Sequence, residues 1–186
     1  MINDIQNNLI KKESIFGPDN YKPLPVVLSR AKGVWAWDVN EKKYLDMMSG
    51  YSAVSHGHAH PELLRVFHEQ SSKLSLTSRA FYTDTLGPYL ETITKISGFE
   101  MCLPMNSGAE AVETAIKSSR RWASRTKKVK PGKAEIIVAE GNFHGRTTTI
   151  ISFSTDENSR HDFGPHTPGF VTVKYGCAAV SYTHLT

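Results

Sequence analysis

The predicted strand Ala134–Ala139, with the apolar run Ile136-Ile137-Val138 at its centre, restricts the fold more than any other feature of this sequence. Uninterrupted apolar strands are typical of parallel sheets that are buried on both faces. The apolar segment Met101–Met105 predicts an earlier strand, and the alternating residues Phe170–Tyr175 predict a later one. A helix is predicted between the first two strands, over Gly108–Ser124. This order of strands and helices predicts the beginning of an α/β layered domain.

The residues that precede this domain predict a polar segment followed by a β-hairpin. Residues 1–24 are polar and end in a proline-containing stretch that favours an extended backbone. Gly33–Val39 and Lys43–Met47 are rich in aromatic and aliphatic residues and flank Asn40-Glu41, which predicts a hairpin. Residues 50–60 are predicted to form a loop.

Two more helices are predicted before the sheet. One begins at Pro61, because the missing N–H of a proline costs nothing in the first helical turn. The other is predicted over Thr85–Ser97. The apolar face of the first is predicted to include Leu63, Leu64, Phe67 and Leu74. The stripe predicted for the helix at 108–124 consists of Val112, Ala115, Ile116, Ser119 and Trp122.

Composition argues against several classes of function. The chain has 186 residues and a net charge of +4, and its densest basic stretch, 125–133, contains no aromatic residue that could stack on a base. We interpret that stretch as a solvated helix end and expect no nucleic-acid partner. No apolar run approaches the roughly 18 residues of a membrane span, and the N-terminus lacks a targeting pattern. We therefore expect a cytoplasmic protein with no membrane partner.

Small and polar residues follow the first predicted strand, at Asn106–Glu110. The free backbone N–H groups at a helix start bind anions, and Gly108 would let a ligand approach the backbone. Ser107 and Glu110 also fit a capping box, which would need no ligand, and spacing alone does not separate the two interpretations. The position at the carboxyl end of a sheet strand favours a ligand.

A second candidate site, Gly141–Thr147, follows the strand at 134–139 and should lie at the same sheet edge. It places Phe143, His144 and Arg146 between glycines and a threonine, and arginine is suited to a bidentate grip on a carboxylate. The alternative is a glycine-rich turn with incidental polar residues. The segment that follows, Thr147–Ser154, is β-branched and fits either a strand or a short helix.

The alternating histidines at His56, His58 and His60 raise the question of a metal site. No cysteine lies nearby at ligand spacing, and Glu62 is the one carboxylate close to them in sequence. We therefore predict hydrogen-bonded loop histidines and no metal.

Five segments, in one collinear order from Tyr21 to Gly176, resemble the class III (fold type I) aminotransferases, which use pyridoxal 5′-phosphate. The segments are Tyr21–Pro25, Tyr51–Val54, Leu76–Tyr82, Pro104–Ala111 and Gly141–Thr147. The second and third segments point to the ornithine branch of that family. The acetylornithine and 4-aminobutyrate branches are the alternatives.

The resemblance implies a role for several residues. Ser107, Gly108 and Ala109 match the segment that holds the cofactor phosphate, and Phe143 matches the aromatic residue that stacks on the pyridine ring. Arg146 matches the arginine that grips the substrate α-carboxylate. Tyr21 and Tyr51 match tyrosines that line the substrate pocket and help to decide which amino group is presented.

The resemblance also implies a fold and a reaction. The fold is a fold type I transferase, with an N-terminal segment and hairpin at 1–60 and the first part of the large parallel-sheet, cofactor-binding domain at 61–176. The reaction moves the δ-amino group of L-ornithine to 2-oxoglutarate, which gives glutamate 5-semialdehyde and glutamate. Family members are usually homodimers at full length.

The family's Schiff-base lysine and the aspartate that pairs with the pyridine nitrogen lie beyond residue 186. No catalytic residue is therefore predicted in this chain. Residues 177–186 show no family feature, and we interpret them as a foreign tail on a truncated frame. We expect the chain alone to be inactive and, with a sheet edge left unpaired, prone to aggregation.

Overall fold

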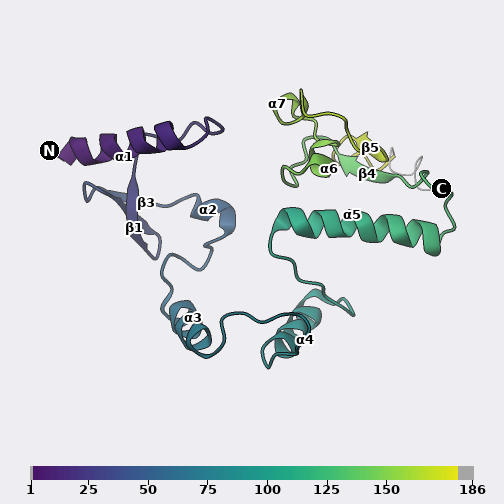
Figure 1. Ribbon diagram of the computed structural model, residues 1–186, viewed down its shortest axis with the longest axis horizontal. Coiled ribbons are helices and arrows are strands. Elements are labelled where there is room, and N and C mark those ends of the chain that lie inside the picture. The colour runs from purple at the N-terminus through teal and green to yellow at the C-terminus, as the bar shows by residue number, and fades with distance from the viewer. Residues whose placement is uncertain (1, 180–186) are drawn as a thin grey trace. The chain divides into compact units, whose positions relative to one another are not determined.

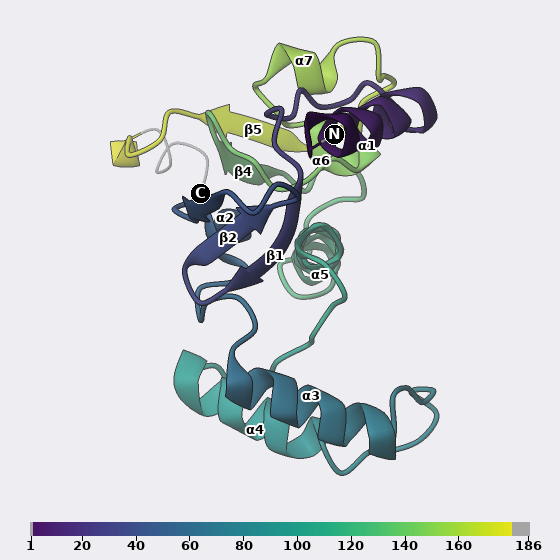
Figure 2. The same cartoon turned by 90° about the vertical axis from the view of Figure 1, so that its left-hand side faces the viewer.

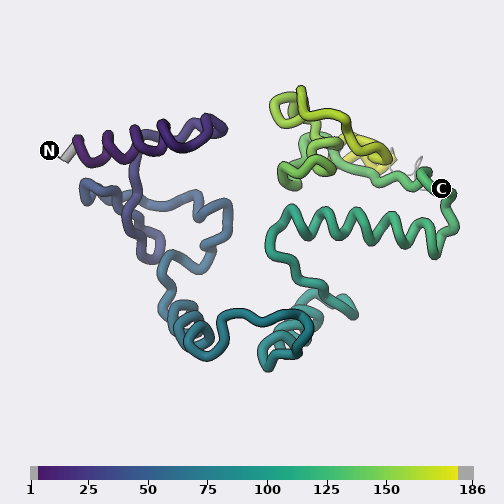
Figure 3. Tube along the Cα trace, viewed as in Figure 1, coloured from purple at the N-terminus to yellow at the C-terminus, as the bar shows by residue number. Residues whose placement is uncertain are grey.

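The computed structural model describes residues 2–179, whose course is traced in Figure 3. The chain forms two compact units, Met1–Tyr82 and Thr83–Thr186, and each is described by itself. The predicted division after residue 60 follows the family's domain plan and stays a prediction. Of the predicted foreign tail at 177–186, residues 180–186 lie outside the described residues.

The first unit contains a three-stranded antiparallel sheet in the order β1-β2-β3 (Figure 2). The strands are β1 (Leu28–Lys32), β2 (Trp35–Asp38) and β3 (Lys43–Leu45). The β2–β3 hairpin was predicted and is confirmed, whereas β1 was not predicted. Basic side chains of β1 and β3 lie over the two indoles of β2, with Arg30 centred 4.0 Å from the ring of Trp37. Such cross-strand cation–π pairs cover the aromatic rings.

A buried carboxylate fixes the turn between β2 and β3. Asp38 is 3% exposed, and its Oδ1 accepts the backbone N–H groups of Asn40 and Lys42 at 2.8 and 2.9 Å. Its Oδ2 accepts the hydroxyl of Tyr44 at 2.9 Å. Burial acts to raise the pKa of Asp38, but the hydrogen bonds from Tyr44, Lys42 and Asn40 outweigh it, so the pKa lies below its ordinary value.

A helix that was not predicted, α1 (Ile2–Phe16), lies beside this sheet (Figure 1). Its sequence contains no glycine or proline until Gly17, and residues with long unbranched side chains favour a helix. Gln6 ties the helix to the sheet unit, because its amide donates to the Pro25 carbonyl at 3.0 Å and accepts from Asn40 at 3.1 Å. The polarity of residues 1–24 concealed this helix.

Two helical segments follow β3: α2 (Ser49–Ser52), a single kinked turn, and α3 (Pro61–Lys73). The start of α3 at Pro61 was predicted and is confirmed. Its predicted apolar face is not buried, since Leu63, Leu64 and Phe67 are all exposed. The helix is supported at its surface by Arg65, which bonds carboxylates one turn away on either side.

In the second unit, α4 (Leu86–Ser97) and α5 (Gly108–Arg125) confirm the two helices predicted there. The strands β4 (Ile136–Ala139) and β5 (Phe170–Val173) pair in parallel, with Ile136 opposite Phe170, so both of these predicted strands are also confirmed. Between them lie two short helices, α6 (Thr148–Ile151) and α7 (Glu157–Arg160). The segment Thr147–Ser154, whose sequence fitted either a strand or a short helix, therefore begins as a helix.

The strand predicted at Met101–Met105 is wrong for the described part of the chain. No ladder forms there, and the side chains of Met101 and Leu103 are exposed. A strand exists only when a neighbour exchanges backbone hydrogen bonds with it, and none of residues 2–179 does so. The apolar residues of this segment favour burial, but they do not specify a neighbouring strand.

The core of the second unit is a cluster of Ile116, Val138, Ile150 and Phe153, with the ring of Phe170 4.5 Å from that of Phe153. Ile116 and Val112 were predicted for the buried face of α5, and both lie on it. Trp122 was predicted there too but is 54% exposed.

Arg120 and Ala123 are partly buried, whereas Trp122 is exposed. The inward face of α5 therefore includes Arg120 and Ala123 and excludes Trp122. The guanidinium of Arg120 lies 5.2 Å from the centre of the Phe170 ring and donates to the Pro168 carbonyl at 2.7 Å. A long cationic side chain can thus face the core when its charged end finds a carbonyl. Within the described residues, no helix is both long and apolar enough to span a bilayer.

We expect Ile150→Ala to lower the free energy of unfolding by about 2–5 kcal/mol, because it opens a cavity at a side chain that is 2% exposed. Urea denaturation followed by circular dichroism measures the change. The control is Ile96→Ala, at a position that is 77% exposed, where the change should stay within about 0.5 kcal/mol. Equal effects at the two positions would contradict this core.

We expect Asp38→Asn to lower the melting temperature at pH 6 and to lower it by a smaller amount in acid. A carboxylate with a lowered pKa stabilises the fold above its unfolded pKa of about 3.9, and this contribution is lost as the pH falls through the folded value. The difference in melting temperature between the two proteins should therefore narrow below about pH 4. The exposed Asp19→Asn serves as the charge control; a difference that stays constant with pH would refute the assignment.

Candidate functional site

The first turn of α5 combines a helix cap with unpaired backbone donors. Ser107 is the N-cap residue, and its hydroxyl accepts the N–H of Glu110 at 3.2 Å. The Glu110 carboxylate turns back and accepts the N–H of Asn106 at 2.8 Å. This arrangement resembles the capping box that the sequence offered. It differs in that Glu110 accepts the N–H of Asn106 instead of that of the N-cap residue Ser107. Within residues 2–179, the N–H groups of Gly108 and Ala109 have no protein acceptor.

The space in front of this turn is open. A Cβ atom placed on Gly108 would meet no other atom within 4 Å. Two unpaired N–H groups, one hydroxyl and the positive end of a helix dipole therefore face space that a ligand could enter. The capping and anion-binding interpretations do not exclude each other, because the Ser107 oxygen accepts its hydrogen bond while its own proton stays available to a ligand.

The loop Gly141–Thr147 lies directly against this helix start. A Cβ atom on Gly145 would be 3.0 Å from the Cβ of Ala109 and 3.2 Å from Cδ1 of Ile150. Gly145 also has φ of 127°, a conformation that other residues avoid. The Thr147 hydroxyl donates to the Glu113 carboxylate, which adds a polar link between the loop and α5. The structure thus brings the two predicted motifs together, because the loop that follows β4 lies against the start of α5.

Hydrogen bonds between side chains and backbone groups hold this loop in place and leave its aromatic side chain exposed. The Asn142 amide donates to the carbonyls of Ala139 and Phe153, at 2.6 and 3.2 Å. The N–H of Gly141 donates to the Thr155 hydroxyl at 2.9 Å. Phe143 is 72% exposed, so a flat face remains free to stack on a ligand.

His144 and Arg146, the residues on either side of Gly145, have different surroundings. The ring of His144 lies 5.9 Å from that of Phe153 and so faces the core cluster. The Arg146 side chain is exposed at the surface of the loop. A guanidinium in that position can bind a carboxylate through two parallel hydrogen bonds.

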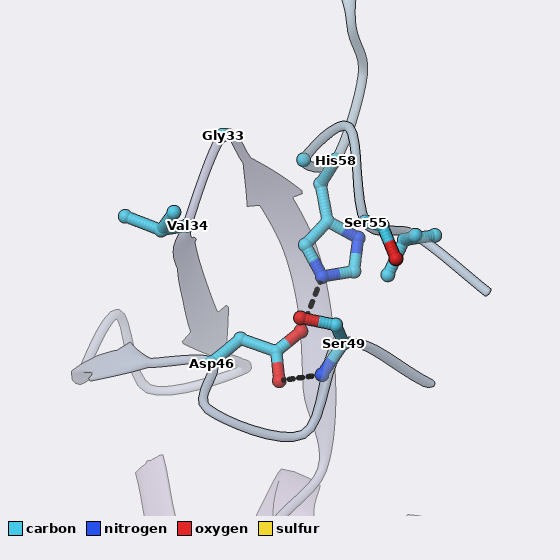
Figure 4. Close-up of a pocket in the computed structure, with 8 residues that line it drawn as sticks. Gly33, Val34, Asp46, Ser49, Ser55 and His58 are labelled. Atoms are coloured by element: carbon cyan, nitrogen blue, oxygen red, sulfur yellow. Dashed lines mark hydrogen bonds and ion pairs between the residues drawn. The ribbon is translucent and has the colours of Figure 1, made fainter. Parts of the chain in front are cut away.

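The two predicted pocket tyrosines, Tyr21 and Tyr51, belong to the unit Met1–Tyr82, and both are exposed there. Tyr51 lies on the α2 turn, which precedes the histidine-rich loop. Within this loop, Nε2 of His58 lies 2.7 Å from Oδ2 of Asp46 (Figure 4). The prediction of a hydrogen-bonded loop histidine is therefore confirmed for His58.

Sequence reasoning did not identify Asp46 as a residue of interest. Its Oδ1 accepts the N–H groups of Met48 and Ser49 at 2.9 and 2.8 Å, which fixes the exit from β3. The hydrogen bond from His58 lowers the pKa of Asp46, those from Ser49 and Met48 add to the effect, and burial opposes it. An aspartate that follows a strand and precedes Ser49-Gly50 by three residues was the available signal.

The remaining histidines do not assemble a metal site in the described part of the chain. The rings of His56 and His60 meet edge to face at 6.5 Å, and Nδ1 of His60 is buried without a hydrogen-bond partner. Among residues 2–179, no group of three histidine, cysteine, aspartate or glutamate side chains converges on one point.

Comparison with known proteins gives consistent matches. The family model of class III aminotransferases matches residues 16–184. The ornithine aminotransferase of Brevibacillus brevis is 55% identical over 170 residues, which is 91% of this chain and 43% of that protein.

Two solved structures extend the comparison. The ornithine aminotransferase of Toxoplasma gondii matches with a TM-score of 0.90 and 38% identity, over 91% of this chain and 40% of that one. The acetylornithine aminotransferase of Elizabethkingia anophelis matches with a TM-score of 0.79 and 51% identity, over 96% and 43%. The chain thus spans less than half the length of these relatives.

The α/β order, the helix start with open donors and the glycine loop packed against it all agree with a family match that covers nearly the whole chain. This chain belongs to the class III aminotransferases and has their α/β fold.

Proposed function

We propose that the protein, at the length of its relatives, is a pyridoxal 5′-phosphate-dependent transaminase that acts on L-ornithine. The observation that carries the proposal is the contact of the Gly145 loop with the open start of α5. This contact brings the loop that carries Phe143 and Arg146 against the helix start, which supports a site shared by the two. The relatives' names supply the reaction, because proteins named ornithine aminotransferase are about half identical to this chain.

The helix start fits a phosphate. The unpaired N–H groups of Gly108 and Ala109 and the hydroxyl of Ser107 would donate to its oxygens, and the helix dipole favours the negative charge. The Glu110 carboxylate is already engaged by the Asn106 N–H. In the T. gondii relative, pyridoxal phosphate is described at the active site. When bound, this cofactor supplies the electron sink of the reaction.

The remaining residues orient the reactants. Phe143 would lie against the flat pyridine ring and fix its plane. Arg146 would bind the α-carboxylate of the amino acid substrate, which directs the distant δ-amino group toward the cofactor. Tyr21 and Tyr51 would line the pocket and select which amino group is presented.

The substrates of the proposed reaction are L-ornithine and 2-oxoglutarate, and the products are glutamate 5-semialdehyde and glutamate. The family resemblance extends the proposal to a homodimer at full length and a cytoplasmic location. A second candidate is acetylornithine aminotransferase, which is favoured by the 51% identity to the E. anophelis enzyme.

We expect the full-length protein that carries this chain to convert L-ornithine and 2-oxoglutarate into glutamate 5-semialdehyde. Trapping the semialdehyde as a coloured adduct, with glutamate measured in parallel, checks this result. N-acetylornithine and 4-aminobutyrate are assayed as competing amine donors. A kcat/KM at least about tenfold higher with either of them, a difference of about 1.4 kcal/mol in transition-state binding, would replace ornithine as the substrate.

We expect Gly108→Ala to weaken pyridoxal 5′-phosphate binding by about tenfold without changing the melting temperature of the apo protein. The new methyl group meets no protein atom, so the fold should tolerate it, but it fills the space in front of the N–H donors. Equilibrium titration of the full-length apo protein measures the affinity. Gly87→Ala in α4, which also meets nothing within 4 Å, is the matched control. Unchanged affinity in Gly108→Ala would count against this cradle.

A further inference from the structure

The residues that carry Tyr51 adopt a strained backbone. Ser49, Gly50, Tyr51 and Ser52 have φ values of 48°, 54°, 56° and 71°, so four consecutive residues lie in the left-handed region. Three of them are not glycine, and each such residue costs free energy in this conformation. A run of this kind persists only where the surrounding structure holds it.

The support comes from the two ends of the segment. At its start, the Asp46 carboxylate accepts the N–H groups of Met48 and Ser49, and the Asp46 N–H donates to the Val34 carbonyl at 2.9 Å. At its end, the backbone of His58 exchanges two hydrogen bonds of 2.8 Å with Gly33. Both ends are thereby fixed to the turn between β1 and β2.

The contact between His58 and Asp46 closes this segment into a loop. Nε2 of His58 lies 2.7 Å from Oδ2 of Asp46, as Figure 4 shows, and the two side chains are 29% and 19% exposed. The backbone of Gly57 packs closely against Gly33, because a Cβ on Gly57 would lie 3.1 Å from Cα of Gly33. The one carboxylate therefore joins the start of the strained turn to the end of the loop.

Tyr51 depends on this loop for its direction. Its side chain is 87% exposed, and among residues 2–179 its hydroxyl has no hydrogen-bond partner. Side-chain packing therefore does little to orient it, and its backbone conformation sets where it points.

We propose that Asp46 and His58 are positioning residues that hold the left-handed turn at Ser49–Ser52 and so aim Tyr51 at the amine substrate. This inference rests on the proposed function, because it takes Tyr51 as part of the substrate pocket. The pair acts through Tyr51 and does not touch the reacting atoms.

The test compares three variants of the full-length holoenzyme. His58→Phe keeps a ring but removes the hydrogen bond, His58→Gln retains an N–H donor at similar reach, and His56→Phe makes the same change at an exposed histidine of the same loop. Each is measured for its KM for L-ornithine, its ratio of δ- to α-transamination products, and amide hydrogen exchange over residues 48–54.

We expect His58→Phe to raise the KM for ornithine and to accelerate exchange over residues 48–54 by about tenfold each, the usual scale for losing a charge-assisted hydrogen bond. The share of α-transamination product should increase, since an unaimed Tyr51 no longer selects the amino group. His58→Gln should restore most of each property, and His56→Phe should resemble the wild type.

Three outcomes would overturn the inference: an unchanged KM and product ratio in His58→Phe, the same change in His56→Phe, or faster exchange with unaltered kinetics. If His58→Phe does not fold, Asp46→Asn, which keeps an acceptor for the Met48 and Ser49 N–H groups, is judged by the same criteria.

The failure of the proposed function would look different. In that case the wild-type protein would give no semialdehyde, and the variants would be compared with whichever amine it does convert. Unaltered KM and exchange with that amine would then overturn the positioning role as well.

Discussion

The candidate site depends on one close backbone contact, between Gly145 and Ala109. A single Cβ on Gly145 would lie 3.0 Å from the Ala109 side chain, so the loop reaches the helix only because this residue is glycine. Through this contact, the loop after β4 and the start of α5 share one edge. The open N–H groups of Gly108 and Ala109 thus lie beside the loop that carries Phe143 and Arg146.

The loop that carries Tyr51 is also held by contacts at its ends. We propose that these contacts set the direction of the Tyr51 side chain. Four left-handed residues store strain, and the Asp46 carboxylate offsets it through bonds to the backbone and to His58. In the proposed transaminase, this support would let Tyr51 help to select which amino group of the substrate is presented.

Much of the site could be predicted because its signals are local. Ser107 caps α5 through a residue three positions away, and Pro61 begins α3 at the residue where a proline fits. The strands β4 and β5 follow from continuous or alternating apolar residues. The contact of His58 with Asp46, 12 residues earlier, has no such signal, because His58 is placed by backbone hydrogen bonds to Gly33, which is far from it in sequence.

The sequence alone determined the starts of α3, α4 and α5, the two parallel strands, the hairpin and the family, since each depends on residues within a few positions or on motif order. Tertiary structure decided which side of α5 is buried, where Arg120 displaced Trp122 because Phe170 and the Pro168 carbonyl receive its side chain. It also decided that Met101–Met105 forms no strand within the described residues. A strand and a buried face both require a partner from elsewhere in space, and a local pattern cannot specify that partner.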